Sequence, residues 1–224
     1  SHETLEQSNA FVFQDGKMMT FDGEVLAVSN FDIGFDAAVP GVDFLKILQR
    51  FPDEEIDISL QGKELRIKGK RKQAGLTMPE KISLPYADVP EPGKMSTLPE
   101  ELSFYLLQAA RICGKDHSDA RTTHVHVTPN LIESTECFRL YRAELETGIK
   151  EDILIPAAPL ISLGQTKLKK GNVNNGWLHI LTEDEVQLSI LCSQMEYFSK
   201  KTLEGVLAID GEKIHLPKNL KEIL

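Results

Sequence analysis

The stretch Met18-Met19-Thr20-Phe21-Asp22-Gly23-Glu24-Val25-Leu26-Ala27-Val28 occurs twice in this chain in loose form, and this repeat decides the fold. Its second copy is the segment from Asn130 to Tyr141. Two further pairs of segments follow in the same order, residues 39–45 with 155–161 and residues 96–102 with 214–220. Segments that recur in order at an offset of roughly 115 residues predict one domain fold that is used at least twice.

The length of the chain agrees with this interpretation, since 224 residues suit two domains of about 100–120 residues each. Residues 85–94 contain three prolines and a glycine, a composition typical of a linker. We therefore predict a first domain over residues 1–94 and a second over residues 95–208. Residues 209–224 are expected to begin a further domain or to form a terminal helix.

Composition and charge exclude several classes of protein. The sequence shows no secretory signal, and no apolar run approaches the ~20 residues that a membrane crossing needs. The number of cysteines is odd and their spacing shows no pairing, which favours a reduced, cytoplasmic setting; they are Cys113, Cys137 and Cys192. The net charge of −9 argues against nucleic-acid binding by the whole surface but allows a local basic face.

The first domain is predicted to consist mainly of strands with one short helix. A hairpin turns at Asp15-Gly16, and strands follow over residues 25–28 and 31–39. Pro40 opens a helix that ends near residues 51–53, and its apolar stripe is Val42, Leu45, Ile47 and Leu48. The remaining predicted strands are residues 56–60, 64–68 and an edge strand over 77–84.

The second domain is predicted to begin with a long helix over residues 98–113, with Thr97 as N-cap and Glu100 completing a capping box. A second helix covers residues 156–168. Strands are expected over residues 122–127, 131–134, 138–145, 152–155, 171–181 and 186–192.

The two ends of the chain are out of phase with the repeat. The first domain has no counterpart of the long helix, whereas residues 216–224 resemble the opening turns of that helix. Two explanations are open: the chain is a piece of a longer protein, or its terminal helix fills the vacancy in a neighbouring unit.

The repeat, together with residues 20–28, 39–48 and the hairpin 56–70, resembles the beta sliding clamp, the processivity subunit of bacterial DNA polymerase III, and its phage relatives. The resemblance implies an α+β fold of tandem DNA-clamp domains, with helices lining one face and antiparallel sheets forming the outer wall. In this family six such domains close a ring around duplex DNA. Three domains per chain make a dimer, and two would need a trimer.

The function that the resemblance implies is topological rather than enzymatic. Such a ring slides on double-stranded DNA, tethers a replicative polymerase, and receives polymerase and clamp-loader subunits through short peptide motifs. An alternative is a clamp-fold protein-interaction module that does not encircle DNA. A hydrolase on an unrelated repeated fold has no support, because the sequence offers no phosphate loop and no Ser/His/Asp set. No cofactor is expected.

A sliding ring needs positive charge on the helices that face the DNA phosphates. The cations expected there are Lys46, Arg50, Arg111, Lys115, Lys167, Lys169 and Lys170. The simpler explanation is that cations near helix C-termini complement the helix dipole. A second basic cluster, residues 63–72, lies on a predicted hairpin, where a solvated strand face is the favoured explanation.

The family also has a hydrophobic groove that takes partner peptides. On matching positions, this groove would include Arg121, Thr123, His124, Thr135, Phe138, Arg139 and Leu140. The family's turn is of the Asp-Gly-His-Arg-Leu type, whereas this chain has Glu136-Cys137-Phe138-Arg139-Leu140, without the glycine and the histidine. Phe138 would either refill the pocket or close it, and a buried strand with no peptide site is the alternative.

A zinc site is conceivable but not predicted. His124 and His126 are two residues apart on a strand and therefore share a face, and His117 and Asp119 are close in sequence. Two histidines at this spacing also occur by chance on exposed strands, and no cysteine has the spacing of a metal ligand. We predict no metal.

Overall fold

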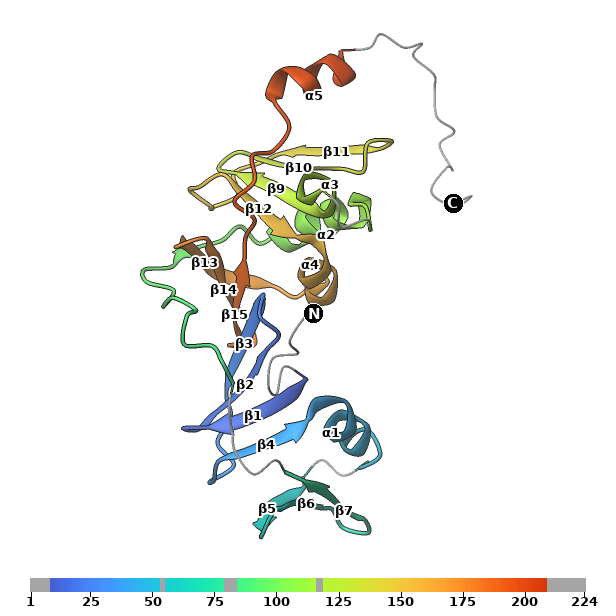
Figure 1. Cartoon of the computed structure of the whole chain (residues 1–224), viewed down its shortest axis with the longest axis vertical. Helices are drawn as coiled ribbons and strands as arrows, with labels where there is room; N and C mark the ends of the chain where they lie inside the picture. Colours follow the sequence, from blue (N-terminus) through green and yellow to red (C-terminus); the bar gives the residue numbers. More distant parts are fainter. Residues whose placement is uncertain (1–8, 53–54, 79–83, 116–118, 209–224) are drawn as a thin grey trace.

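The computed structural model describes residues 9–52, 55–78, 84–115 and 119–208. An eight-stranded sheet, in the order β4-β1-β2-β3-β15-β14-β13-β8, runs through both halves of the chain (Figure 1). Its strands are β1 (Ala10–Gln14), β2 (Lys17–Phe21), β3 (Val25–Asn30), β4 (Ala37–Pro40), β8 (Ser96–Thr97), β13 (Leu168–Asn174), β14 (Trp177–Thr182) and β15 (Gln187–Leu191).

The two halves are joined edge to edge inside this sheet. β3 from the first half pairs antiparallel with β15 from the second, with Val28 opposite Gln187 and Val25 opposite Ile190. Phe21 and Trp177 pack beside this seam with ring centroids 6.4 Å apart. The repeated units therefore share one continuous sheet instead of meeting as separate bodies.

A smaller sheet, in the order β5-β6-β7, completes the first half; its strands are β5 (Asp57–Gln61), β6 (Glu64–Lys68) and β7 (Gln73–Thr77). The hairpin β5–β6 agrees with the predicted strands. The third strand is β7, which ends at Thr77, so the predicted edge strand over residues 77–84 overlaps it at one residue only; residues 79–83 lie outside the described residues. β7 pairs with β6 because Leu76 then joins Leu65 and Ile67 in the core.

The helix α1 (Gly41–Leu48) begins directly after Pro40, as predicted. Its predicted apolar stripe is wrong for two of four residues. Phe44, Ile47 and Leu48 face the core, whereas Val42 and Leu45 are exposed. The stripe is shifted because the rings of Phe11 and Phe13 receive Phe44 edge-on, which fixes the rotation of the helix. The preceding strand is also shorter than predicted, since β4 covers Ala37–Pro40.

The second half contains α2 (Leu102–Ile112), α3 (Ala120–Thr123), α4 (Ala157–Leu163) and α5 (Lys200–Leu207). The predicted capping box is wrong: Thr97 belongs to β8, and the N-cap of α2 is Glu101 without a side-chain hydrogen bond. Pairing of Thr97 with Lys170 in the sheet places the start of α2 several residues later.

A four-stranded sheet in the order β11-β10-β9-β12 covers α2 in this half; its strands are β9 (His124–Thr128), β10 (Leu131–Thr135), β11 (Leu140–Glu144) and β12 (Ile153–Pro156). The predicted strand over residues 171–181 is in fact two strands, β13 and β14. They meet at Asn175-Gly176, where both residues have positive φ, 48° and 78°. An Asn-Gly pair is the usual signal for such a turn.

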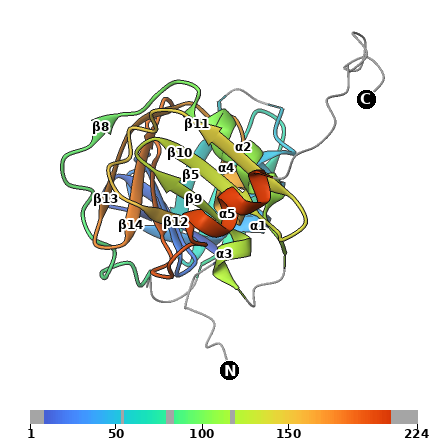
Figure 2. The same ribbon diagram turned by 90° about the horizontal axis from the view of Figure 1, so that it is seen from above.

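The helices α1, α2 and α4 lie on one side of the molecule, and the eight-stranded sheet lies on the other (Figures 1 and 2). This layout agrees with the predicted α+β class, with helices on one face and antiparallel sheets as a wall. None of the helices in the described part of the chain has the length and apolar character that a membrane crossing requires.

Candidate DNA-facing helices and peptide groove

The helix side of the second half is built on a tightly packed core. α2 buries Leu106, Ala109 and Ala110, and it packs against α4 and the strand β10. The small alanine side chains let the backbones approach closely, and the hydroxyl of Ser134 on β10 donates to the carbonyl oxygen of Ala109 at 2.7 Å. The outward faces of α2 and α4 are thereby held on a rigid base.

Four of the seven predicted DNA-facing cations lie on or directly after helices on this side. Lys46 and Arg50 are exposed in the last turn of α1 and just beyond it, and Arg111 and Lys115 occupy the same places on α2. Among the described residues, none of these four side chains forms an ion pair. Their positive charge is therefore available to a ligand.

The other three predicted cations are not on a helix, which corrects the sequence analysis. α4 ends at Leu163 because Gly164 takes a positive φ of 61°, and the chain then enters β13. Lys169 and Lys170 lie on that strand, and Lys167 directly precedes it. Acidic side chains neutralise two of them: Lys167 lies within 4 Å of Glu100 and Glu183, at 3.6 and 3.7 Å, and Lys169 pairs with Glu185.

Large apolar side chains are also exposed on these helices. Val42 and Leu45 on α1 are 62% and 50% exposed, Phe104 on α2 is 47% exposed, and Ile161 on α4 is 50% exposed. Leu45 and Ile161 occupy matching positions of the sequence repeat. The helix side is thus a mixture of cations and apolar groups.

The predicted groove residues on β10 and β11 surround a tight loop. Thr135 and Leu140 face each other where the two strands end. The Thr135 hydroxyl donates to the Arg139 carbonyl at 2.7 Å and accepts from the Cys137 amide at 3.0 Å. Cys137 has a φ of 76°, so it occupies the left-handed conformation that a glycine would adopt without strain.

Phe138 lies at the tip of this loop and is 95% exposed. It therefore does not refill a pocket in this structure. Arg139 beside it forms an ion pair with Glu136 across the same loop, which holds the guanidinium on the loop.

The remaining groove residues lie on α3 and the start of β9, next to that loop. A Cβ atom placed on Gly114 would lie 3.5 Å from the Thr122 carbonyl oxygen and 3.7 Å from the Glu136 Cβ, so the two segments meet there. Thr123 is buried, and its hydroxyl lies 2.9 Å from His124 Nδ1. The structure thus brings the predicted residues to one end of the four-stranded sheet.

Arg121 has two partners at this end of the sheet. Its guanidinium forms a bidentate ion pair with Asp119, with a shortest distance of 2.7 Å, and lies over the ring of Phe198 at 4.7 Å from the centroid. The hydrogen bond with Arg121 holds the pKa of Asp119 below its usual value. Sequence reasoning missed Phe198, since a single aromatic residue in a connecting segment carries no local signal.

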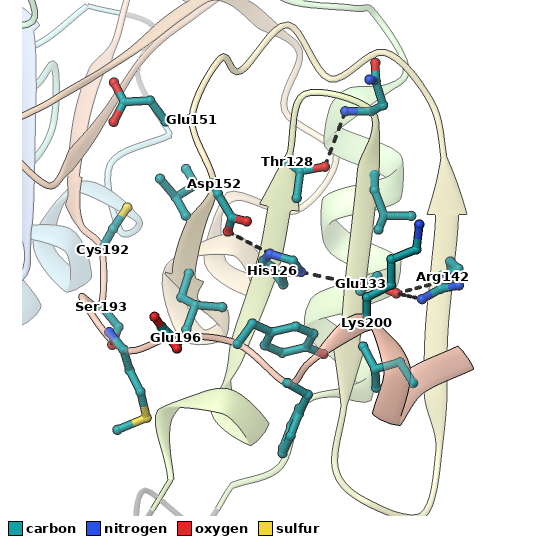
Figure 3. A pocket seen from close by; sticks show the side chains of 18 of the residues that line it. His126, Thr128, Glu133, Arg142, Glu151, Asp152, Cys192, Ser193, Glu196 and Lys200 are labelled. Atoms are coloured by element: carbon teal, nitrogen blue, oxygen red, sulfur yellow. Dashed lines mark hydrogen bonds and ion pairs between the residues drawn. The ribbon is translucent and has the colours of Figure 1, made fainter. Parts of the chain in front are cut away.

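Phe198 belongs to a segment that we call the strap, residues 193–207, which crosses the outer face of the four-stranded sheet and ends in α5. The strap and the sheet border an open cavity of about 1080 Å³ (Figure 3). Of the residues predicted for the groove, none lines this cavity, so the cavity and the predicted groove are neighbouring features that share Phe198.

A buried network of charged side chains forms the floor of the cavity. Glu133 is 2% exposed and binds both Arg142 and His126, the latter at 3.3 Å; the other imidazole nitrogen of His126 lies 2.7 Å from Asp152 (Figure 3). Tyr197 of the strap stacks on the His126 ring with centroids 4.3 Å apart.

This network shifts the pKa values of its members. Burial alone would lower the pKa of His126, but the hydrogen bonds and charges of Glu133 and Asp152 outweigh burial and raise it. Burial alone would raise the pKa of Glu133, but hydrogen bonds from His126 and Arg142 hold it below its usual value. At neutral pH a carboxylate–guanidinium pair therefore supports the imidazole on which the strap rests.

The conceivable zinc ligands do not converge in the described part of the chain. No group of three or more His, Cys, Asp or Glu side chains there is arranged to hold a metal ion. His126 binds carboxylates and His124 lies beside Thr123, while His117 lies outside the described residues.

No protein-family model and no curated protein matches this sequence. Solved structures do match. They include a protein described as a DNA polymerase III beta subunit from Eubacterium rectale (TM-score 0.73, 14% identity, 94% of this chain and 63% of that one). The DNA polymerase sliding clamp from Bacillus subtilis (0.69, 15%, 91% and 62%) and the DNA polymerase III beta subunit from Thermotoga maritima (0.69, 18%, 90% and 60%) match similarly.

The chain has the sliding-clamp fold. Identities of 12–18% support that statement about fold and leave the function to be argued from this chain's own residues. The chain spans less than two thirds of the length of the clamps that it matches. A function can be argued from two features of the described residues, the helix side and the continuous sheet.

Proposed function

We propose that this chain is a sliding-clamp-like processivity factor that encircles duplex DNA and tethers a replicative polymerase. The observation that carries the proposal is the pairing of β3 with β15, which joins two repeated units into one sheet while their helices stay on the opposite side. Units joined in this way, copy after copy, produce a curved wall with a helix-lined inner face. In this proposal residues 1–94 and 95–208 are two clamp domains, and residues 209–224 begin a further domain or form a terminal helix.

The charges support an inner face that attracts DNA without fixing it. Lys46, Arg50, Arg111 and Lys115 project from the helix side, while the whole chain carries a net charge of −9. Cations that contact phosphates loosely give binding that is independent of sequence and sensitive to salt. The function needs no cofactor and no catalytic group, and it belongs in the cytoplasm where replication proteins act.

Partner proteins would dock at the end of the four-stranded sheet. The predicted groove residues Thr135, Phe138 and Leu140 lie there together with Arg121. The exposed ring of Phe138 and the stacked pair of Arg121 and Phe198 offer apolar and cation–π contacts to a short peptide from a polymerase or a clamp loader.

The experiment that tests this proposal is retention on circular DNA. The solution mass of the chain, measured by light scattering at micromolar concentration, should exceed that of a monomer. The protein should stay on a nicked circular plasmid through gel filtration and leave it after one restriction cut. A monomer, or equal retention on circular and linear DNA, would contradict encirclement.

A second function is favoured by the apolar groups on the helix side. Val42, Leu45, Phe104 and Ile161 are exposed there, and apolar patches more often mark protein contacts than DNA contacts. The chain would then be a clamp-fold interaction module that does not encircle DNA. Replacing Leu45 and Ile161 by Ser separates the two: loss of a protein partner, in a protein whose unaltered form is not retained on circular DNA, favours the module.

A further inference from the structure

The loop between β6 and β7 is fixed against the end of α1. Lys72 Nζ donates a hydrogen bond to the carbonyl oxygen of Arg50 at 2.9 Å, and the Gly69 amide donates to the Lys72 carbonyl oxygen at 2.9 Å. The loop with the basic residues of the hairpin is therefore adjacent to the end of α1. The sequence favours a solvated strand face for these residues, separate from the cations of α1.

Five cations lie on the two segments that this hydrogen bond joins, and we call them the cationic ridge: Lys46, Arg50, Lys70, Arg71 and Lys72. All five side chains belong to exposed residues. Lys70 and Arg71 form the tip of the loop, and among the described residues neither has an acidic partner. Of the acidic residues close to the ridge in sequence, Asp43 lies on α1 and Glu55 and Asp57 follow that helix, while Asp53 and Glu54 lie outside the described residues.

The ridge carries more charge than the helix end requires. A helix C-terminus is stabilised by a cation within its last turn, and Lys46 and the bond from Lys72 to the Arg50 carbonyl already supply that. Lys70 and Arg71 add nothing to the helix. Neither side chain has an acidic partner among the described residues, so the charge of both is available to an anionic ligand.

The loop stands on a rigid base. Leu65 and Ile67 of β6 are fully buried, and β6 pairs with strands on both sides. A ligand would therefore meet side chains whose backbone is already fixed, so that binding costs little ordering of the main chain.

We propose that the cationic ridge binds phosphate groups of the duplex DNA backbone and so extends the DNA-facing surface from α1 onto the β6–β7 loop. This inference rests on the proposed function, because it takes duplex DNA as the ligand. Arg71 can bind phosphate oxygens in a fork, and Lys70 acts as a mobile point charge. Contacts to backbone phosphates carry no sequence information, so this contact is independent of DNA sequence.

The test compares two double variants of equal charge change. Lys70→Glu with Arg71→Glu alters the ridge, and Lys200→Glu with Lys201→Glu alters exposed cations on α5, at the opposite end of the molecule (Figure 1). Fluorescence anisotropy with a short linear duplex is measured over a range of salt. Each lost phosphate contact reduces the magnitude of the negative slope of log K against log salt by about 0.9. For the ridge variant, the magnitude of this slope should fall by an amount that corresponds to roughly two lost contacts. Its affinity at low salt should fall about tenfold or more.

The α5 variant should keep the slope of the unaltered protein, and Lys70→Gln with Arg71→Gln should fall between the two. Equal slopes and affinities for the ridge and α5 variants would overturn the inference. So would a changed solution mass of the ridge variant with an unchanged salt slope, since the ridge would then contact an acidic surface of a second copy.

Failure of the inference and failure of the proposed function give different results. If the unaltered protein leaves circular plasmid as easily as linear DNA, yet the ridge variant alone loses duplex affinity, the ridge binds DNA without encirclement. If retention on circles holds and the ridge variant binds the duplex as before, encirclement stands and the ridge has no part in it.

Discussion

The guanidinium of Arg121 lies over the ring of Phe198, 4.7 Å from its centroid, and this contact ties the strap to the predicted peptide groove. Phe198 meets Tyr197 edge-on at 5.2 Å, and Tyr197 stacks on His126. One continuous set of ring contacts therefore links the groove to the buried charged network under the strap.

Phe198→Ala should weaken peptide binding at the groove. The variant loses the ring on which Arg121 rests, and an exposed cation–π contact contributes about 0.5–1 kcal/mol. We expect the Kd of a polymerase-tail peptide to rise about two- to fivefold by isothermal titration. Phe104→Ala, an exposed aromatic residue on α2, is the matched control and should leave this Kd unchanged. An equal effect of both variants would remove Phe198 from the groove.

Phe138→Ala should separate binding from stability. The side chain is 95% exposed, so its removal should change the free energy of unfolding by less than about 0.5 kcal/mol in urea titrations. If Phe138 caps a bound peptide, peptide affinity should nevertheless fall about tenfold, as expected for an interface aromatic residue. Full affinity in this variant would favour the module that lacks a peptide groove.

The His126–Glu133 pair should make stability depend on pH. Folding raises the pKa of His126 above the ordinary imidazole value of 6.5, so this contribution is complete below pH 6.5 and is lost as pH rises through the folded-state pKa. Folding lowers the pKa of Glu133 below 4.5, so its contribution is present above pH 4.5 and is lost as pH falls through the folded-state value. The two contributions coincide between about pH 4.5 and 6.5.

Thermal melts of the unaltered protein and of His126→Asn test this dependence. The difference in Tm between the two proteins should be largest within that window and should shrink toward pH 9. A difference that is constant with pH would show that His126 contributes only by packing under Tyr197.

Cys137→Gly should stabilise the protein. A left-handed conformation costs a residue with a side chain about 1–2 kcal/mol, and the greater freedom of glycine in the unfolded chain offsets part of this. The net gain should be up to about 1 kcal/mol in urea unfolding, while Cys137→Val should be destabilising. If Gly and Val destabilise alike, the loop is held by the Thr135 hydrogen bonds and not by its φ.

Thiol labelling should distinguish the three cysteines. Burial raises the pKa of Cys113 and of Cys192 to about 12, so neither thiol should react at pH 8 in the folded protein. Cys137 is exposed and should react rapidly with Ellman's reagent. One fast equivalent is expected, and Cys137→Gly should abolish it. Fast reaction of a second thiol would show that the core around α2 opens.

Charge reversal should weaken duplex binding more for the predicted cations on the helix side than for those on the strand β13. Arg111→Glu with Lys115→Glu removes unpaired cations from the helix side, whereas Lys169→Glu with Lys170→Glu changes a strand on which Lys169 already pairs with Glu185. The first double variant should lower the salt slope of duplex binding by about 2, and the second should lower it little. The reverse order would place the DNA on the sheet side.

Much of the fold could be predicted because its signals are local. The hairpins at Asp15-Gly16 and at residues 61–63, and the helix after Pro40, were predicted near their observed bounds. Errors arose where tertiary contacts overrode a local pattern. Thr97 fits an N-cap but pairs in the sheet, and Leu45 fits an apolar stripe but is exposed because Phe44 enters the aromatic core.

The candidate site was predicted only in part. The positions predicted for the groove lie together at one end of the four-stranded sheet, and their role in peptide binding stays a prediction. Phe198 and Tyr197 carry no local signal, because they lie some 60 residues further along the chain in a segment without periodicity. The sequence predicts that the lysines after α4 lie on a helix, whereas α4 ends at Leu163 because Gly164 has a φ of 61°. Glycine adopts positive and negative φ about equally, so its presence alone does not fix where the helix stops.

The sequence by itself determined the repeated unit, its strands and turns, and the order in which they come, because hydrophobic period and turn residues act over a few neighbours. Tertiary structure alone decided that β3 pairs with β15, that the strap lies on His126, and that the β6–β7 loop joins the cations of α1. These contacts join residues far apart in sequence. Backbone hydrogen bonds and side-chain packing select them among many chemically equivalent partners, and no local pattern records that choice.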